Sequence, residues 1–302
     1  MASKGEKISK SKGNSKVEPR ELVKTHSADS IRYWAGTGRL GNDIIFSEET
    51  LARGQKLINK LWNVAKFIEM HIHDYNENKE KFKEEVKEYN DLEYIDKWIL
   101  AKYEEMEKGY LKYLEEYEIG IALNHLEKFF WNFCDDYIEI VKHRLYRPEE
   151  FGERARYSGQ KTVYTLLFKL IQAFSIYLPY VTEEIYHELY MNDMNIPSIH
   201  ITSIENLNIE DKNKEIYLNI GNTIMEIISE LRGEKTNKNV SLKTPFSIVE
   251  IDVNSNILEG ITKAEKDFKA TVTIENLKLN DKQTSLENNF NILKSELIIE
   301  EK

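Results

Sequence analysis

The sequence predicts a mainly α protein, an antiparallel helical bundle followed by a small C-terminal α+β appendage. Only 5 prolines and 13 glycines occur among 302 residues, which favours long helices over a turn-rich β architecture. Apolar residues recur at helical spacing through most of the first 190 positions, and the pattern changes after Pro197. The length suits roughly two domains, and 41% apolar content is ample for a core.

The N-terminal region, 1–46, is predicted to hold a loop and connecting helices. Residues 1–17 are small and basic without apolar periodicity, and Pro19 then suits the first turn of a short helix. A second helix is expected from Ser27, whose hydroxyl can cap it. We expect four of its residues to face inward: Ala28, Ile31, Trp34 and Ala35.

The segment Gly36–Gly41 ends that helix. It matches the GxGxxG pattern, but a dinucleotide site needs a strand before the glycines and a helix directly after them. Here a helix precedes them, so we interpret the glycines as a helix stop.

The second region, 47–197, is predicted to be the bundle. Ser47 can cap a long helix, and further helices are expected from about 91, over about 118–145, after Gly159, and from Thr182. Residues 76–90 are predicted to be a loose linker and 148–159 a polar loop. The predicted core positions of the helices are Leu57, Leu61, Val64, Ala65, Ile68, Leu92, Ile95, Trp98, Ile99, Tyr103, Ala122, Leu126, Phe129, Phe133, Tyr137, Ile140, Val163, Leu166, Leu167, Leu170, Ile171 and Phe174.

The third region, 198–302, is predicted to be the appendage. A helix over about 211–232 would bury Ile216, Ile220, Ile224, Ile227 and Leu231. Residues 247–253 alternate like a strand, 255–268 are predicted to be helical, and 270–274 a second strand.

Charge is segregated along the chain. The net charge is -10, yet residues 1–24 carry a local +4, and residues 142–161 and 232–243 each carry +3. Because phosphate contacts depend on local clusters, three such clusters modestly favour RNA over ordinary solvated surfaces. The single Cys134 excludes an internal disulfide and fits the cytoplasm, and no signal peptide or membrane span is expected.

The first basic cluster contains Lys-Ile-Ser-Lys-Ser-Lys-Gly-Asn at 7–14. Several lysines, hydroxyls and a glycine in a flexible loop are suited to gripping a polyphosphate, because ammonium groups neutralise charge on phosphate oxygens. The residues by themselves also allow a floppy basic terminus.

This segment resembles the KMSKS signature of class I aminoacyl-tRNA synthetases, with Ile8 in place of the methionine. The segments at 42–48, 59–63, 130–135 and 178–186 look like the valyl-tRNA synthetase subgroup, so that the resemblance covers 7 to about 190. It implies a bundle of the anticodon-binding type and a chain corresponding to the C-terminal half of a valine–tRNA ligase. That half would lack the nucleotide-binding and editing domains and would be inactive alone.

The resemblance also implies roles for the loop. Lys7 and Lys10 would be catalytic, and Ser9, Lys10 and Ser11 would bind ATP. In the whole enzyme, ATP with Mg and valine would be bound, and tRNA(Val) would be the RNA partner of a monomer.

Which residues touch tRNA is a separate hypothesis. Unstacked bases are read by aromatic stacking and polar contacts, and two clusters offer cations beside aromatic residues or helix ends. The candidate tRNA-binding residues are Lys142, Arg144, Arg147, Arg154, Arg156, Arg232 and Lys235. Cations at a solvated helix C-terminus, favoured by the helix dipole, remain an equal alternative.

Two further alternatives stay open. His71, His73 and Asp74 are interpreted as surface residues at a helix end, because they lack a spaced fourth metal ligand, so no metal site is predicted. The chain could instead be a free-standing tRNA-binding or protein-interaction module without catalytic activity.

Overall fold

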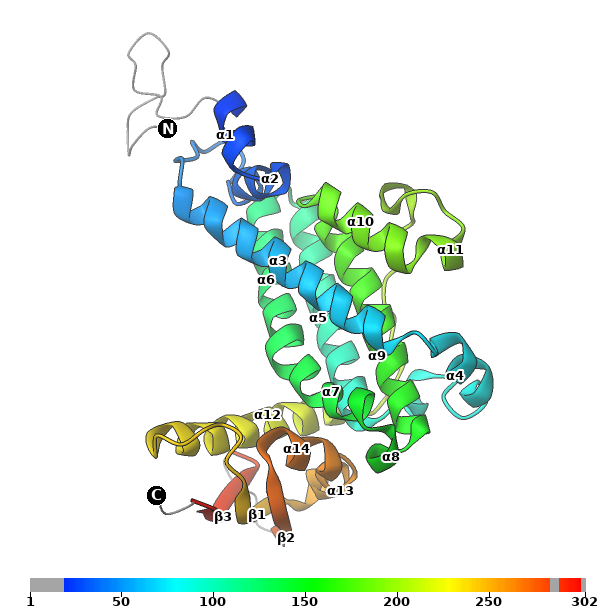
Figure 1. Cartoon of the computed structure of the whole chain (residues 1–302), viewed down its shortest axis with the longest axis vertical. Coiled ribbons are helices and arrows are strands. Elements are labelled where there is room, and N and C mark those ends of the chain that lie inside the picture. Colours follow the sequence, from blue (N-terminus) through cyan, green and yellow to red (C-terminus); the bar gives the residue numbers. More distant parts are fainter. Residues whose placement is uncertain (1–18, 283–287, 300–302) are drawn as a thin grey trace. The chain divides into compact units, whose positions relative to one another are not determined.

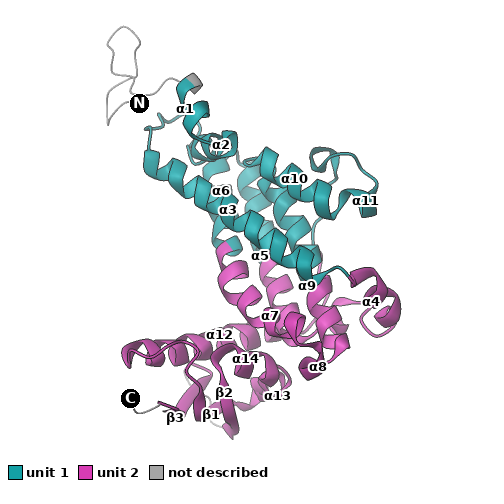
Figure 2. Cartoon of the chain, in the orientation of Figure 1, with its two compact units in different colours: residues 1–73, 104–130, 163–207 teal, residues 74–103, 131–162, 208–302 magenta. Residues whose placement is uncertain are grey.

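A computed structural model describes residues 19–282 and 288–299 (Figure 1). Its fold is mainly α with a small C-terminal sheet, which confirms the predicted fold class. The chain divides into two compact units (Figure 2). The first holds residues up to His73 with 104–130 and 163–207, and the second holds 74–103, 131–162 and 208–302.

The first unit is built from helices only, in the part that the structure describes. Its elements are α1 (Pro19–Thr25), α2 (Ala28–Gly36), α3 (Glu48–His71), α10 (Pro179–Leu189), α11 (Met191–Met194) and the 3-10 turn η4 (Ile199–Ile201). Three longer helices contribute residues to both units: α5 (Tyr94–Glu115), α6 (Ile119–Asn132) and α9 (Glu153–Phe174).

Both predicted serine caps are confirmed. The Ser27 hydroxyl accepts a hydrogen bond from the N–H of Ser30, and the Ser47 hydroxyl accepts one from Thr50. The buried face of α3 contains all five predicted residues, and the predicted core residues of α5, α6 and α9 are likewise buried. Cys134 is buried as well.

The inward face of α2 was predicted wrongly. Asp29, Ser30 and Tyr33 are buried, whereas Ala28 and Ala35 are exposed. Asp29 is inside because its carboxylate accepts hydrogen bonds from the N–H groups of Tyr180 and Val181, at 3.2 and 2.8 Å, where α10 begins. Free N–H groups at a helix start attract a carboxylate, so a polar contact overrides the apolar periodicity.

The second unit contains helices and the sheet. Its elements are α4 (Tyr75–Phe82), η2 (Tyr89–Asp91), η3 (Phe133–Tyr137), α7 (Ile138–Tyr146), α8 (Pro148–Phe151), α12 (Lys214–Asn237), β1 (Phe246–Asn254), α13 (Ser255–Lys263), α14 (Glu265–Val272), β2 (Ile274–Lys282) and β3 (Phe290–Leu297). Helix α14 packs against α7, and α12 packs against α13, α14 and β3.

The sheet has the order β2-β1-β3. β1 pairs with β2 in parallel and with β3 in antiparallel fashion, with Val249 opposite Leu277 and Ser295. Helices α13 and α14 form the crossover that parallel strands require. β1 is mostly buried, whereas the two outer strands are largely exposed.

Four further expectations were wrong. The linker at 76–90 contains α4 and η2, because Phe82 and Val86 are buried and anchor it. The loop at 148–159 contains α8 and the start of α9, since a proline at the first helical position is compatible with a helix. Residues 270–272 end α14, and the strand begins at Ile274. Ile216 is 46% exposed.

Candidate nucleic-acid interface

The predicted ATP loop lies outside the described residues. This applies to Lys7, Ser9, Lys10 and Ser11, so their roles stay a prediction from the sequence. The predicted tRNA contacts all lie in the second unit and can be placed individually.

Arg144 does not face solvent. Its guanidinium donates two hydrogen bonds to the carboxylate of Asp96, at 2.8 and 2.9 Å, and its Nε lies 2.9 Å from Oδ1 of Asp267. Its side chain is 1% exposed. The proposed set of tRNA contacts therefore omits Arg144, which instead joins α5, α7 and α14 inside the unit.

Asp96 is surrounded by donors. Besides Arg144, the hydroxyls of Tyr137 and Ser158 donate to it at 2.8 and 2.5 Å. Burial raises the pKa of Asp267 to about 6, with Arg144 opposing the rise and the charge of Asp96 adding to it. Two carboxylates thus share one buried guanidinium.

Arg154 and Arg156 hold α9 to the segment that runs from α4 to α5. Arg156 pairs with the carboxylate of Asp74 and is 8% exposed. Burial acts to raise the pKa of Asp74, but hydrogen bonds from Arg156 and Gln160 outweigh it and lower the pKa to about 2. Arg154 donates to Glu93 at 2.6 Å and to the carbonyl of Asp91 at 2.5 Å. These contacts explain why a charged stretch folds there, and they occupy both guanidinium groups.

Lys235 is also buried. Its ammonium donates to the carbonyl oxygens of Leu242 and Val272, at 3.0 and 2.7 Å, and lies 4.8 Å from the centre of the Phe246 ring. Burial, followed by the charge of Arg232, lowers the pKa of Lys235 to about 8. Lys235 stabilises the appendage and, like Arg144, is omitted from the proposed contacts.

Lys142 and Arg147 remain partly exposed. Lys142 pairs with Glu139 at 2.7 Å and Arg147 with Glu150 at 2.9 Å. Arg147 lies just beyond the C-terminus of α7, where the helix dipole favours a cation. Pro148 begins α8 directly after it, and Gly152, with φ of 93°, ends that turn.

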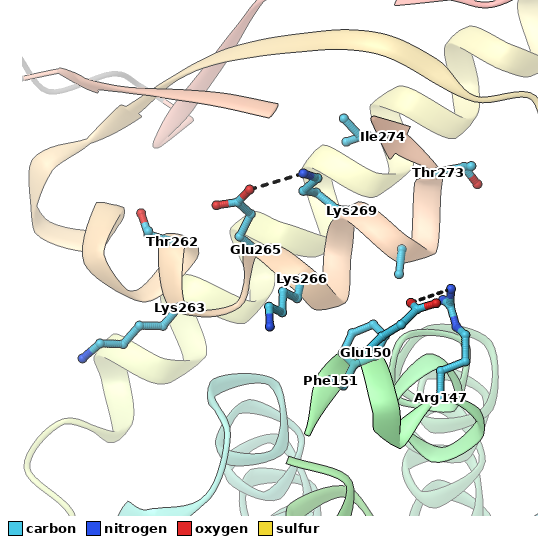
Figure 3. A pocket seen from close by; sticks show the side chains of 11 residues that line it. Arg147, Glu150, Phe151, Thr262, Lys263, Glu265, Lys266, Lys269, Thr273 and Ile274 are labelled. Atoms are coloured by element: carbon cyan, nitrogen blue, oxygen red, sulfur yellow. Dashed lines mark ion pairs between the residues drawn. The ribbon is translucent and has the colours of Figure 1, made fainter. Parts of the chain in front are cut away.

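Arg147 lines an open cavity of about 660 Å³ (Figure 3). One wall comes from α8, with Glu150 and Phe151, and the other from α13 and α14. The second wall supplies three lysines at three-residue spacing: Lys263, Lys266 and Lys269. Four cations against Glu150 and Glu265 give the lining a net charge of +2.

Two features of this cavity suit a polyanion with bases. Lys266 is exposed and makes no ion pair within the described ranges, so its ammonium is available. Phe151 provides an aromatic face, with the Arg147 guanidinium 5.6 Å from its centre. Cations beside an aromatic ring are the mixture that single-stranded nucleic acid binds.

The three lysines were missed from the sequence. The sequence predicted only a helix over 255–268 there, although Lys263, Lys266 and Lys269 recur at every third position. That spacing was the signal that could have found them.

The sequence prediction was wrong for His71, which is 7% exposed rather than on the surface. Across the described ranges, no group of three or more His, Cys, Asp or Glu side chains is arranged to hold a metal ion. Nor does any described helix have the length and apolar character of a membrane span.

A family model described as the anticodon-binding domain of tRNA ligase matches residues 96–251. The chain is 35% identical over 288 residues to the valine–tRNA ligase of Rickettsia conorii, covering 91% of this chain and 35% of that protein. It is 34% identical over 295 residues to that of Ehrlichia ruminantium strain Gardel, covering 94% of this chain and 33% of that protein.

The chain thus spans about a third of the length of these curated relatives. The matched residues include η3, α7, α8 and α12, and with them Arg147 and Arg232. Because the family model matches more than half of the chain, the chain belongs to the family of anticodon-binding domains of tRNA ligases.

Proposed function

We propose that this chain is the tRNA-binding region of a valine–tRNA ligase, and that the cavity between α8 and α13–α14 contacts the tRNA backbone. One observation carries the cavity assignment. An open hollow with net charge +2 contains Lys266, which has no ion-pair partner among the described residues. Lysines in this setting attract phosphate and release its counterions on binding.

The wider activity rests on the relatives and on the sequence. The relatives are named valine–tRNA ligases, which supports valine, ATP and tRNA(Val) as the substrates of the whole enzyme. Lys7, Ser9, Lys10 and Ser11 would hold the ATP phosphates there, with Mg as the counterion. The proposal also takes the protein to be a monomer, with domain boundaries after residues 46 and 197. It places the protein in the cytoplasm, which the single Cys134 supports.

The test is binding of the chain to tRNA(Val) and to variants with exchanged anticodons, measured by filter binding over a range of salt. Affinity should fall steeply with salt and should depend on the anticodon. Lys266→Ala should weaken binding to all these RNAs uniformly and reduce the slope of log affinity against log salt by roughly 0.7 to 0.9.

Lys87→Ala is the matched control. Lys87 is an exposed lysine of the same unit and does not line the cavity, so its removal should leave the salt slope unchanged. Equal affinity for every anticodon would overturn anticodon reading and favour a module that binds tRNA without selecting it. An unchanged slope in Lys266→Ala would remove the cavity from the interface.

A further inference from the structure

A second cavity in the same unit differs in chemistry. It measures about 360 Å³ and lies between η3 and α12. This size is within the roughly 300 to 1,000 Å³ typical of ligand pockets. Its lining residues are Asp136, Met225, Glu226, Ile228, Ser229 and Arg232.

A π-helical turn places Asp136 at this cavity. Within η3, the N–H of Ile138 bonds to the carbonyl of Phe133, five residues earlier, which inserts an extra residue into the helix. Phe133, Cys134 and Tyr137 stay buried while Asp136 reaches the cavity. Such insertions interrupt the regular hydrogen bonding of an α-helix and occur frequently at functional sites.

Asp136 and Arg232 line the cavity with opposite charges but are not paired. The charge of Arg232 acts on Asp136, yet neither side chain makes an ion pair or hydrogen bond with any residue that the structure describes. Burial raises the pKa of Asp136, with Lys102 and Arg232 opposing the rise. A half-buried carboxylate without a donor is costly unless a ligand supplies one.

The charge of the lining decides what kind of ligand fits. Asp136 and Glu226 against Arg232 give a net charge of -1, so a phosphate would be repelled here. A neutral group with a donor beside an acceptor would satisfy both charged side chains. Met225 and Ile228 supply apolar surface for a flat ring.

A nucleobase with an exocyclic amine has this combination. Carboxylates accept hydrogen bonds from base amines, and guanidinium groups donate to acceptors on base edges. Unstacked bases of an RNA loop expose these edges to side chains.

We propose that the cavity between η3 and α12 binds one extruded, amine-bearing base of the RNA, with Asp136 accepting from the amine and Arg232 donating to the neighbouring ring acceptor. The proposal rests on the tRNA-binding function above and names the residues that would select a base. Asp136 and Arg232 are then specificity residues, whereas the basic cavity at α8 contacts the backbone.

The test uses this chain with tRNA(Val) transcripts in which each amine-bearing base of the anticodon loop is replaced by uracil, one at a time. One replacement should weaken binding to the native chain by roughly 5- to 100-fold. Asp136→Asn should bind the unaltered RNA more weakly and should no longer distinguish it from that replacement.

Two further variants sharpen the result. Asp135→Asn makes the same change at the neighbouring exposed position, which does not line the cavity, and should keep native affinity and preference. Arg232→Lys keeps the charge but loses the two-pronged donor, so it should reduce the preference even if Asp136→Asn fails to fold.

The two proposals fail in different ways. If the native chain binds tRNA and both Asp136→Asn and Arg232→Lys retain its affinity and base preference, the base pocket is wrong and the tRNA-binding function stands. If the native chain binds no tRNA, the proposed function fails and the base pocket fails with it.

Discussion

Arg144 and Asp96 form a buried pair with two hydrogen bonds, from Nη2 to Oδ1 at 2.8 Å and from Nη1 to Oδ2 at 2.9 Å. Their side chains are 1% and 0% exposed. Arg144 also reaches Asp267 on α14, so one guanidinium connects the bundle helices α5 and α7 to the appendage. Arg144, from the basic stretch 142–161, thus contributes its charge to stability within the unit.

Removing one partner of this pair should destabilise the protein strongly. Asp96→Ala leaves the Arg144 charge buried and also removes the acceptor of Tyr137 and Ser158. We expect a loss of about 3 to 5 kcal/mol in the free energy of unfolding, measured by urea denaturation. Glu139→Gln, which breaks the surface pair with Lys142, should cost about 1 kcal/mol or less. Similar losses for the two variants would contradict the role of the buried pair.

The second carboxylate at Arg144 should make stability depend on pH. The pKa of Asp267 is about 6 in the folded state, above the roughly 3.9 of an unfolded aspartate. Between these values the folded state binds more protons, so stability from this group falls as pH rises from about 4 to 6, by up to about 1.4 kcal/mol per pH unit.

Comparison with Asp267→Asn isolates this effect. The stability of the native chain minus that of the variant should decline from pH 4 to 6 and level off above it, in urea titrations at each pH. A difference that rises with pH would mean that pairing with Arg144 outweighs burial.

Lys235→Met should destabilise the appendage. The methionine keeps much of the apolar stem, but the carbonyls of Leu242 and Val272 lose their donor. Leaving buried acceptors unsatisfied costs about 1 to 3 kcal/mol, and we expect a loss of about 2 kcal/mol by thermal or urea unfolding. Lys238→Met, one turn away and paired at the surface with Glu234, should change stability by about 0.5 kcal/mol or less. If Lys235→Met left the stability unchanged, the buried ammonium group of Lys235 would not stabilise the appendage.

Lys10→Ala tests the loop in an intact ligase carrying this sequence. If Lys10 contacts the ATP phosphates, valine activation should slow by roughly 100-fold, as expected for a lost group that stabilises charge in the transition state. Pyrophosphate exchange measures activation, and filter binding of tRNA should change little. Lys16→Ala, just beyond the motif, is the control. Comparable losses in activation and tRNA binding would exclude the ATP role.

The sequence by itself determined the long helices and most of their apolar faces. On α3, Leu57, Leu61 and Ile68 are buried, and so are the predicted residues of α5, α6 and α9. An apolar stripe at helical spacing leaves water only when that face of the helix packs against other elements. The helix caps at Ser27 and Ser47 could also be predicted from the sequence, because each needs only a serine hydroxyl and the N–H group three residues later.

Only the tertiary structure decided which charged side chains are buried. Arg144 and Lys235 look like surface cations in the sequence, but distant residues, Asp96, Asp267 and the carbonyl of Val272, stabilise them inside. The basic cavity and the cavity lined by Asp136 and Arg232 likewise arise where separate segments meet. A charge is buried only where a partner from elsewhere in the chain stabilises it, and the spacing of apolar residues does not reveal that partner.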